Sequence, residues 1–300
     1  LDLAPGDEVL MTPYTFISTA TSVLRAGLRP VFVDIAPGAW HPDLAGFEAA
    51  WTERTRAVLV VHLFGEPLAL DGLAATCALR GAALIEDCAQ AIGGRFEDGA
   101  HVGSKGLAGT LSFFPAKNLG ALGDGGAVLC SDPELAGRIR ATRQHGCVVR
   151  YRHDRLGGNF RLDALQAAML GVLLPALDGW VDARRANASG YGERLAQIAQ
   201  NAPDRLLLPA QVPGHAWNQY VIRLAQRDEV RAQLTAAGIG TAIYYPGTLN
   251  QQPALAAVGP HAPMPLAEAA CAQTLALPVY PGLSPTERDR VADALIAALN

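Results

Sequence analysis

The sequence predicts an α/β protein, with a mostly parallel central sheet between helices in a large domain and a small C-terminal α+β domain. Short apolar runs alternate with helix-length segments through the first half of the chain. These runs are continuously apolar, which is typical of strands that are covered on both faces. Near Leu162 the pattern changes to two long helical segments with little strand signal between them. Repeated strand–helix–strand units form parallel sheets flanked by helices, so we expect the large domain over residues 1–177 and a bridging helix with the small domain over residues 178–300.

The elements of both domains follow from this alternation. Strands of the large domain are predicted at Glu8–Met11, Pro30–Ile35, Arg56–His62, Ala82–Asp87, Gly109–Phe114 and Gly126–Cys130. Helices lie between the first four of them, at Phe16–Ala26, Asp43–Trp51 and Asp71–Leu79. Further helices are predicted at Leu162–Leu174, Trp180–Ile198, Arg227–Ala237 and Pro285–Leu299, with strands at Tyr220–Leu224, Thr241–Tyr245 and Thr274–Val279.

The composition excludes several classes of partner. A formal net charge of −4 over 300 residues gives no basic field for nucleic acid and no cationic face for anionic membranes. Apolar stretches such as Ala57–Leu63 are strand-sized and too short to span a bilayer. The five cysteines form no CxxC pair and no metal-ligand spacing, so we expect free thiols in a reducing compartment, hence a cytoplasmic protein without a metal site.

An acidic pair follows the fourth predicted strand, in the string Leu84-Ile85-Glu86-Asp87-Cys88-Ala89-Gln90. Asp87 is expected just beyond the apolar part of the strand, at the edge where ligands of open α/β sheets bind. A helix N-cap is an equally good interpretation of this pattern alone.

A lone lysine stands in the string Ser112-Phe113-Phe114-Pro115-Ala116-Lys117-Asn118-Leu119-Gly120, between a predicted strand and a glycine-rich return. Desolvation there would lower the pKa of Lys117 and favour its use as an amine nucleophile. A lysine on an exposed loop is the alternative that composition favours. Further on, Gly157-Gly158-Asn159 precedes a predicted helix and suggests free backbone N–H groups for an anion.

The order and spacing of these strings resemble the DegT/StrS family of sugar-nucleotide aminotransferases, which are pyridoxal-phosphate (PLP) enzymes of fold type I. The resemblance runs the length of the chain, through Gly6-Asp7-Glu8-Val9, Thr12-Pro13-Tyr14-Thr15-Phe16, Pro30-Val31-Phe32-Val33-Asp34-Ile35, Val61-His62-Leu63-Phe64-Gly65, Glu86-Asp87-Cys88-Ala89-Gln90, Pro115-Ala116-Lys117-Asn118-Leu119-Gly120, Gly123-Asp124-Gly125-Gly126 and Tyr244-Tyr245-Pro246.

This resemblance implies roles for individual residues. Lys117 would form the Schiff base with PLP, and Asp87 would keep the pyridine nitrogen protonated, which makes the ring an electron sink. Phe16 would stack on the ring, Gln90 would hydrogen-bond the side of the phenolic oxygen, and Ser112 would bind the phosphate. Asn159 would reach the phosphate from a partner subunit, which implies a homodimer with shared sites. For His62, packing in the strand and a role in the site are equally good interpretations.

The implied reaction transfers an amino group, typically from glutamate, to a nucleotide-linked keto sugar. Lys117 argues against the sugar dehydratases of the same fold, which carry histidine at that position. Two alternatives stay open: another fold-type-I PLP enzyme that acts on amino acids, and a non-catalytic chain that keeps the PLP fold.

The sequence also departs from the family pattern. Asn250 stands where the family usually has a histidine, and Glu66 stands where glutamine is frequent, so the sugar is not specified. The family's Ser-Gly-Thr phosphate-binding turn lies upstream of Gly6-Asp7-Glu8-Val9. We therefore expect the given sequence to be truncated at its N-terminus and to bind PLP poorly as it stands.

Overall fold

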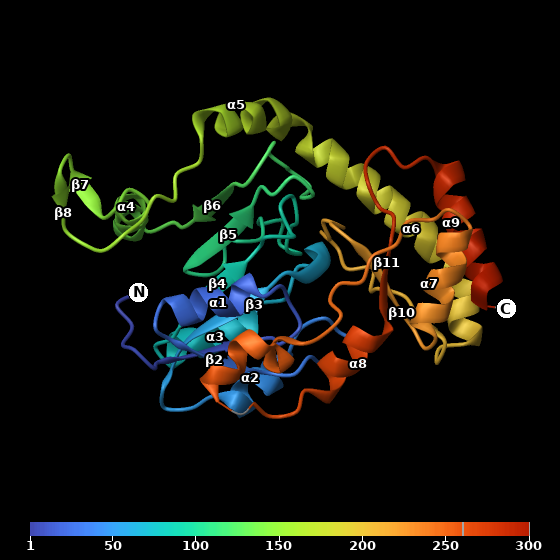
Figure 1. Ribbon diagram of the computed structural model, residues 1–300, viewed down its shortest axis with the longest axis horizontal. Helices are drawn as coiled ribbons and strands as arrows, with labels where there is room; N and C mark the ends of the chain where they lie inside the picture. The colour runs from blue at the N-terminus through green and yellow to red at the C-terminus, as the bar shows by residue number, and fades with distance from the viewer. Residues whose placement is uncertain (260, 300) are drawn as a thin grey trace.

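The computed structural model describes residues 1–259 and 261–299 and confirms the predicted α/β fold (Figure 1). Its large sheet has the strand order β2-β1-β3-β4-β5-β6, formed by β1 (Glu8–Met11), β2 (Arg29–Phe32), β3 (Thr55–Val61), β4 (Ala83–Asp87), β5 (Ala108–Ser112) and β6 (Gly126–Leu129). The first five strands are parallel, and β6 pairs antiparallel with β5. The sheet is therefore mostly parallel, as the unbroken apolar runs indicated.

Alternate residues of the central strands enter two separate cores. Val9 and Leu59 face one core, with helix α1 (Ser18–Arg25) and helix α8 (Pro265–Gln273) packed over them. Leu10 and Val58 face the other core, under α2 (Leu44–Ala50) and α3 (Asp71–Leu79). Successive side chains of a strand point to opposite faces of the sheet, and this produces the division. Helices cover both faces, so the carboxyl ends of the strands are the part of the sheet that is open to ligands.

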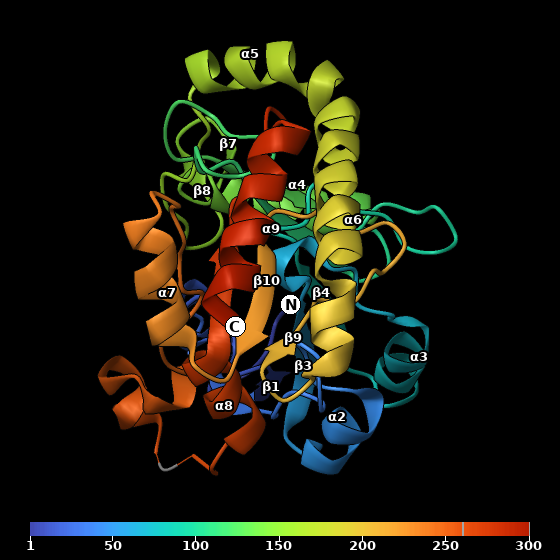
Figure 2. The same cartoon turned by 90° about the vertical axis from the view of Figure 1, so that its right-hand side faces the viewer.

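A second sheet in the C-terminal half has the order β11-β10-β9 and is antiparallel, formed by β9 (Leu206–Leu207), β10 (Tyr220–Leu224) and β11 (Thr274–Leu277). Its core contains side chains from α6 (Leu177–Asn201), α7 (Arg227–Ala236) and α9 (Pro285–Leu299). Figure 2 shows these three helices gathered around β10. The division of the chain at residue 177 stays a prediction, because α8 packs on the large sheet although it belongs to the C-terminal half.

Residues 164–201 form a helical run that is long and apolar enough to cross a membrane by length and composition alone. The run consists of α5 (Ala164–Leu173), a 3₁₀ turn (Leu174–Ala176) and α6. Core helices of globular proteins pass the same test, and here Tyr191 and Leu195 of α6 are fully buried against the small sheet. The α6 half of the run thus belongs to a protein core.

One predicted strand is wrong. Residues Thr241–Tyr245 form no strand, and only Ala242 makes an isolated bridge, to Ala276. The reason is tertiary. The Tyr14 hydroxyl donates to the Tyr244 carbonyl, and Gln90 donates to the Tyr245 hydroxyl. Hydrogen bonds from the large domain thus hold this segment, and it does not pair with a neighbouring strand.

Five helices and strands were not predicted from the sequence: α4 (Pro133–Thr142), the hairpin strands β7 (Cys147–Val149) and β8 (Arg152–His153), β9 and α8. The hairpin lies at the edge of the molecule, beyond α4 (Figure 1). We refer to residues 144–161, which include this hairpin, as the arm.

Candidate active site

Asp87 ends β4 at the open edge of the large sheet. Its Oδ2 accepts a hydrogen bond from the Thr19 hydroxyl at 2.9 Å, and its Oδ1 accepts from the Ala89 N–H at 3.1 Å. Residues 89–93 form turns, so the alternative interpretation of Asp87 as a helix N-cap is wrong. Two donors from different elements fix the carboxylate at a strand end, which is where α/β sheets bind ligands.

Lys117 lies in the turn that follows β5 and is half-buried, not exposed. Burial lowers the pKa of Lys117, while the negative charge of Asp87 acts in the opposite direction. The turn is tight, because a Cβ on Gly120 would lie 2.4 Å from the Pro115 carbonyl oxygen. Asn118 also anchors it by donating from Nδ2 to the Ala216 carbonyl at 2.8 Å. A desolvated amine is thus held near a carboxylate, the state that makes lysine a nucleophile.

Gln90 is buried, and two neighbours fix the orientation of its amide. Its Oε1 accepts from the Phe64 N–H at 2.7 Å, and its Nε2 donates to the Tyr245 hydroxyl at 3.1 Å. One hydrogen of Nε2 is left for a further acceptor. Phe16 lies beside Tyr245 with ring centroids 6.1 Å apart, and 55% of its surface is exposed. An apolar ring and an amide donor therefore border the same space.

Ser112 is the last residue of β5, two residues beyond Thr110, which pairs with Asp87 in the sheet. Its hydroxyl accepts from the Phe114 N–H at 3.3 Å. Five of the six predicted site residues are thus brought together around the ends of β4 and β5: Phe16, Asp87, Gln90, Ser112 and Lys117.

Asn159 is the exception. It lies exposed on the arm, and its Oδ1 accepts from Nε of Arg161 at 2.8 Å. The glycines before it do not stand at a helix N-terminus, since α5 begins only at Ala164. The Gly158 N–H donates to the Thr142 carbonyl, so this N–H is not free for an anion.

The pair His62 and Glu86 lies behind the site, fully buried. Nδ1 of His62 accepts from the Leu68 N–H, so Nε2 carries the proton and donates to Glu86 at 2.9 Å. Burial raises the pKa of Glu86, but hydrogen bonds from His62 and from the Gly106 and Gly103 N–H groups lower it below its usual value. Both ring nitrogens of His62 are engaged, which supports packing over a role in the reaction.

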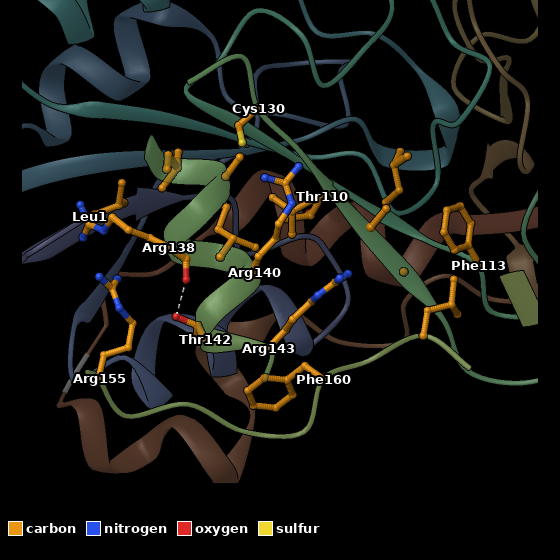
Figure 3. Close-up of a pocket in the computed structure, with 18 residues that line it drawn as sticks. Leu1, Thr110, Phe113, Cys130, Arg138, Arg140, Thr142, Arg143, Arg155 and Phe160 are labelled. Atoms are coloured by element: carbon orange, nitrogen blue, oxygen red, sulfur yellow. Dashed lines mark hydrogen bonds between the residues drawn. The ribbon is translucent and has the colours of Figure 1, made fainter. Parts of the chain in front are cut away.

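A large cavity lies beside the place where these groups meet, not at it. It measures about 800 Å³ and is lined by β5, β6, α4 and the arginines Arg138, Arg140, Arg143 and Arg155 (Figure 3). A neighbouring cavity of about 430 Å³ shares Thr110 and Leu111 with it and reaches Asp87 and Thr19. Neither is lined by Lys117, so the chemical groups identify the candidate site better than volume does.

Sequence reasoning missed Thr19, Asn118 and Tyr245 as parts of the site. Thr19 follows Phe16 by three residues, one helical turn later, and this spacing is the only local signal for it. Tyr245 appeared in a family string and at the end of a predicted strand but was given no site role, and its contact with Gln90 spans 155 residues of sequence. Local patterns carry no information on a contact of that range.

We expect Thr19→Val to slow turnover roughly 2- to 10-fold, because one hydrogen bond to Asp87, of about 0.5–1.5 kcal/mol, is lost without a change of shape. The measurement is kcat/KM at fixed pH. The matched control is Thr21→Val on the same helix, since the Thr21 hydroxyl donates only to the Ser18 carbonyl. Unchanged kinetics in Thr19→Val would show that Asp87 needs no support from α1.

Comparison with known proteins identifies relatives over nearly the whole chain. The model of the DegT/DnrJ/EryC1/StrS aminotransferase family matches residues 1–296. A Geobacillus stearothermophilus protein named pleiotropic regulatory protein is 44% identical over 296 residues, which cover 98% of this chain and 78% of that protein. An Acidithiobacillus ferrooxidans UDP-N-acetyl-3-dehydro-alpha-D-glucosamine 3-aminotransferase is 42% identical over 300 residues, covering 100% of this chain and 80% of the relative. A Saccharopolyspora spinosa dTDP-4-dehydro-2,3,6-trideoxy-D-glucose 4-aminotransferase is 34% identical, covering 98% and 78%.

Solved structures agree with these matches. S. venezuelae DesV, solved in complex with a ketimine intermediate, superposes with a TM-score of 0.93 at 38% identity, covering 99% of this chain and 80% of that one. NtdA from Bacillus subtilis, solved with bound cofactor PMP, has a TM-score of 0.91 at 30% identity, covering 99% and 69%. The predicted fold and family resemblance are both confirmed.

Proposed function

Because the chain belongs to the DegT/DnrJ/EryC1/StrS aminotransferase family, we propose that it transfers an amino group to the C3 carbonyl of a nucleotide-linked keto sugar. The enzyme class is that of the family, a PLP-dependent aminotransferase acting on nucleotide-linked keto sugars. The enzyme class does not specify the position of the keto group or the assembly that performs the reaction, so both are proposals of their own.

The side chains around β4 and β5 fit PLP. A half-buried amine with a lowered pKa stands near a carboxylate that is fixed by two donors, and an exposed aromatic ring borders the same space. We assign Lys117 to the covalent link, Asp87 to the ring nitrogen, Phe16 to the ring face, Gln90 to the phenolic oxygen and Ser112 to the phosphate. PLP, when bound, supplies an electron sink for the carbon that carries the amine.

The main observation behind the proposal is the half-buried amine of Lys117. Desolvation lowers its pKa, so more of the amine is neutral and nucleophilic near pH 7 than for a free lysine. Once released from the cofactor, the Lys117 amine accepts a proton from one reacting carbon and returns it to another. Asn118 holds the turn that carries Lys117 by bonding the Ala216 carbonyl, which keeps the amine aimed at one place.

The choice of C3 rests on similarity. The relative named as a 3-aminotransferase is 42% identical, whereas the relative named as a 4-aminotransferase is 34% identical. We expect glutamate as the amino donor. The test supplies the PLP-loaded enzyme with glutamate and, in separate reactions, UDP- or dTDP-linked 3-keto sugars, the matching 4-keto sugars, and simple keto acids. Mass spectrometry of the products should show amination of a 3-keto sugar first. Preferential amination of the 4-keto sugars would overturn the C3 assignment. Amination of keto acids alone would overturn the assignment of a nucleotide-linked sugar as the substrate.

The active unit that we propose is a homodimer. The arm exposes large apolar side chains, Val148, Val149, Tyr151, Leu156 and Phe160, and α5 exposes Leu165 and Val172. Exposed apolar side chains gathered on one part of a surface are typical of protein interfaces. The arm also carries Asn159, which lies outside the cluster of its own chain, and this supports a role for it in the partner's site. The five cysteines are free, which supports the cytoplasmic location that we expect.

Mixing two inactive variants tests the shared site. A dimer of one Lys117→Ala chain and one Asn159→Ala chain has both defects in one site and none in the other, if Asn159 serves the partner. Equal mixing should therefore restore about a quarter of the wild-type activity, since half of the dimers are hybrids with one intact site. Differently tagged, co-expressed chains establish that hybrids form. If proven hybrids stay inactive, Asn159 serves its own chain or no site at all.

A further inference from the structure

The hydroxyl of Tyr245 is a hydrogen-bond donor whose direction the structure fixes. Oε1 of Gln90 accepts from the Phe64 N–H, so the amide cannot be reversed, and Nε2 must be the atom that faces Tyr245. Gln90 therefore donates and the Tyr245 oxygen accepts, at 3.1 Å. The hydrogen of the Tyr245 hydroxyl must point to another acceptor, and residues 1–259 and 261–299 provide none for it.

Burial raises the pKa of Tyr245 to about 12, which keeps the hydroxyl protonated at neutral pH. The charge of Asp87 acts on Tyr245 and also on Lys117. The ring centroids of Phe16 and Tyr245 lie 6.1 Å apart. Tyr245 thus belongs to the site around Lys117, although it comes from the C-terminal half of the chain.

Main-chain contacts hold Tyr245 there. The preceding carbonyl, of Tyr244, accepts from the Tyr14 hydroxyl, and Tyr14 is fully buried in the core of the large sheet. The Leu249 N–H also donates to the Pro13 carbonyl at 2.8 Å. The segment around Tyr245 is therefore fixed against the β1–α1 connection that carries Phe16.

Two donor hydrogens now lie on neighbouring atoms: the free one of Gln90 Nε2 and that of the Tyr245 hydroxyl. Two donor atoms 3.1 Å apart are close enough to share a single acceptor oxygen with negative charge. On the assumption of the proposed function, we propose that Tyr245 donates a hydrogen bond to the phenolic oxygen of PLP, beside Gln90. Tyr245 is then a further cofactor-contacting residue, and it makes the cofactor's electronic state depend on the C-terminal half of the chain.

The test is a pH titration of the visible absorption band of the Lys117-bound cofactor in wild type and Tyr245→Phe. A hydrogen-bond donor stabilises the negative charge of the phenolic oxygen. The oxygen then binds the proton that it shares with the neighbouring nitrogen less tightly. Without the donor, we expect the midpoint to rise by about one pH unit, a tenfold change equivalent to about 1.4 kcal/mol. Tyr280→Phe, an exposed tyrosine, is the matched control and should leave the midpoint unchanged.

A second measurement uses the 3-deoxy analogue of PLP, which lacks the phenolic oxygen. Wild type should bind PLP about tenfold more tightly than Tyr245→Phe does, while the two should bind the analogue equally. An unchanged midpoint, or the same tenfold loss with the analogue, would overturn the proposal. If wild type itself forms no visible band even at saturating PLP, the proposed function fails instead, so the two failures are distinguishable.

Discussion

Replacing Lys117 by alanine should abolish transamination and the covalent attachment of PLP while leaving the fold intact. The amine serves both as the attachment point and as the proton carrier, and general acid–base catalysis alone contributes about 10²–10⁴-fold. Activity should therefore fall by at least roughly 10⁴-fold, since both functions are lost together. Lys117 lies in a turn with its side chain only half-buried, so its truncation removes little packing.

The chain allows an unusually clear control, because Lys105 and Lys117 are its only two lysines. Lys105 pairs with Asp71 and Asp98 at 2.8 and 2.9 Å, and the hydrogen bonds that it donates to these carboxylates raise its pKa. Borohydride reduction of the PLP-loaded enzyme, followed by peptide mapping, should label the Lys117 peptide only. Lys105→Ala should keep the label and the activity. A borohydride-reducible adduct in Lys117→Ala would refute the assignment.

The change Asp87→Asn should leave PLP bound but slow turnover severely. An amide of the same shape keeps the position at the end of β4 but cannot stabilise a positively charged ring nitrogen. Breaking an ion pair in a partly desolvated site costs about 3–5 kcal/mol. At 1.36 kcal/mol per tenfold, kcat should fall by roughly 10²–10⁴-fold.

The readout that separates this role from a structural one is the split between cofactor affinity and kcat. Asp87→Asn should retain the absorption band of bound PLP and lose turnover, and Asp204→Asn, an exposed acid, should change neither. Thr19→Val, which removes only one donor to Asp87, should fall between them. Near-normal kcat in Asp87→Asn would show that Asp87 only supports the turn that follows β4.

Some of this protein is legible in local sequence. The strands β1 and β10 and the helices α3 and α9 have the predicted boundaries, because continuous apolar runs and helical spacing reflect burial directly. Asp87 and Lys117 were found because strand ends in α/β sheets carry ligands and because their strings resemble a family. Helix α4 had a local signal too, since Asp132 caps it and Pro133 opens it, but the sequence analysis did not use that signal.

The contacts that complete the site come from the tertiary structure. Thr19 reaches Asp87 across 68 residues, and Gln90 reaches Tyr245 across 155. The same tertiary contact turned Thr241–Tyr245 from a predicted strand into a connection along the large domain. Propensity describes a residue's neighbours in sequence, whereas a hydrogen-bond partner so distant exists only once the sheets have formed.

Helix α8 shows the limit most plainly. It was not predicted, and no side chain of its own N-cap residue, Met264, caps it. The carboxylate of Asp34 instead accepts from the N–H groups of Leu266 and Ala267, 232 and 233 residues away. The N-terminal N–H groups of α8 are thus satisfied from the other end of the chain, and Pro265 at its first position is a local start signal that was not used. The sequence by itself therefore determined the six strands of the large sheet and where the chemical groups stand on them, and the packing of the two halves decided which groups meet.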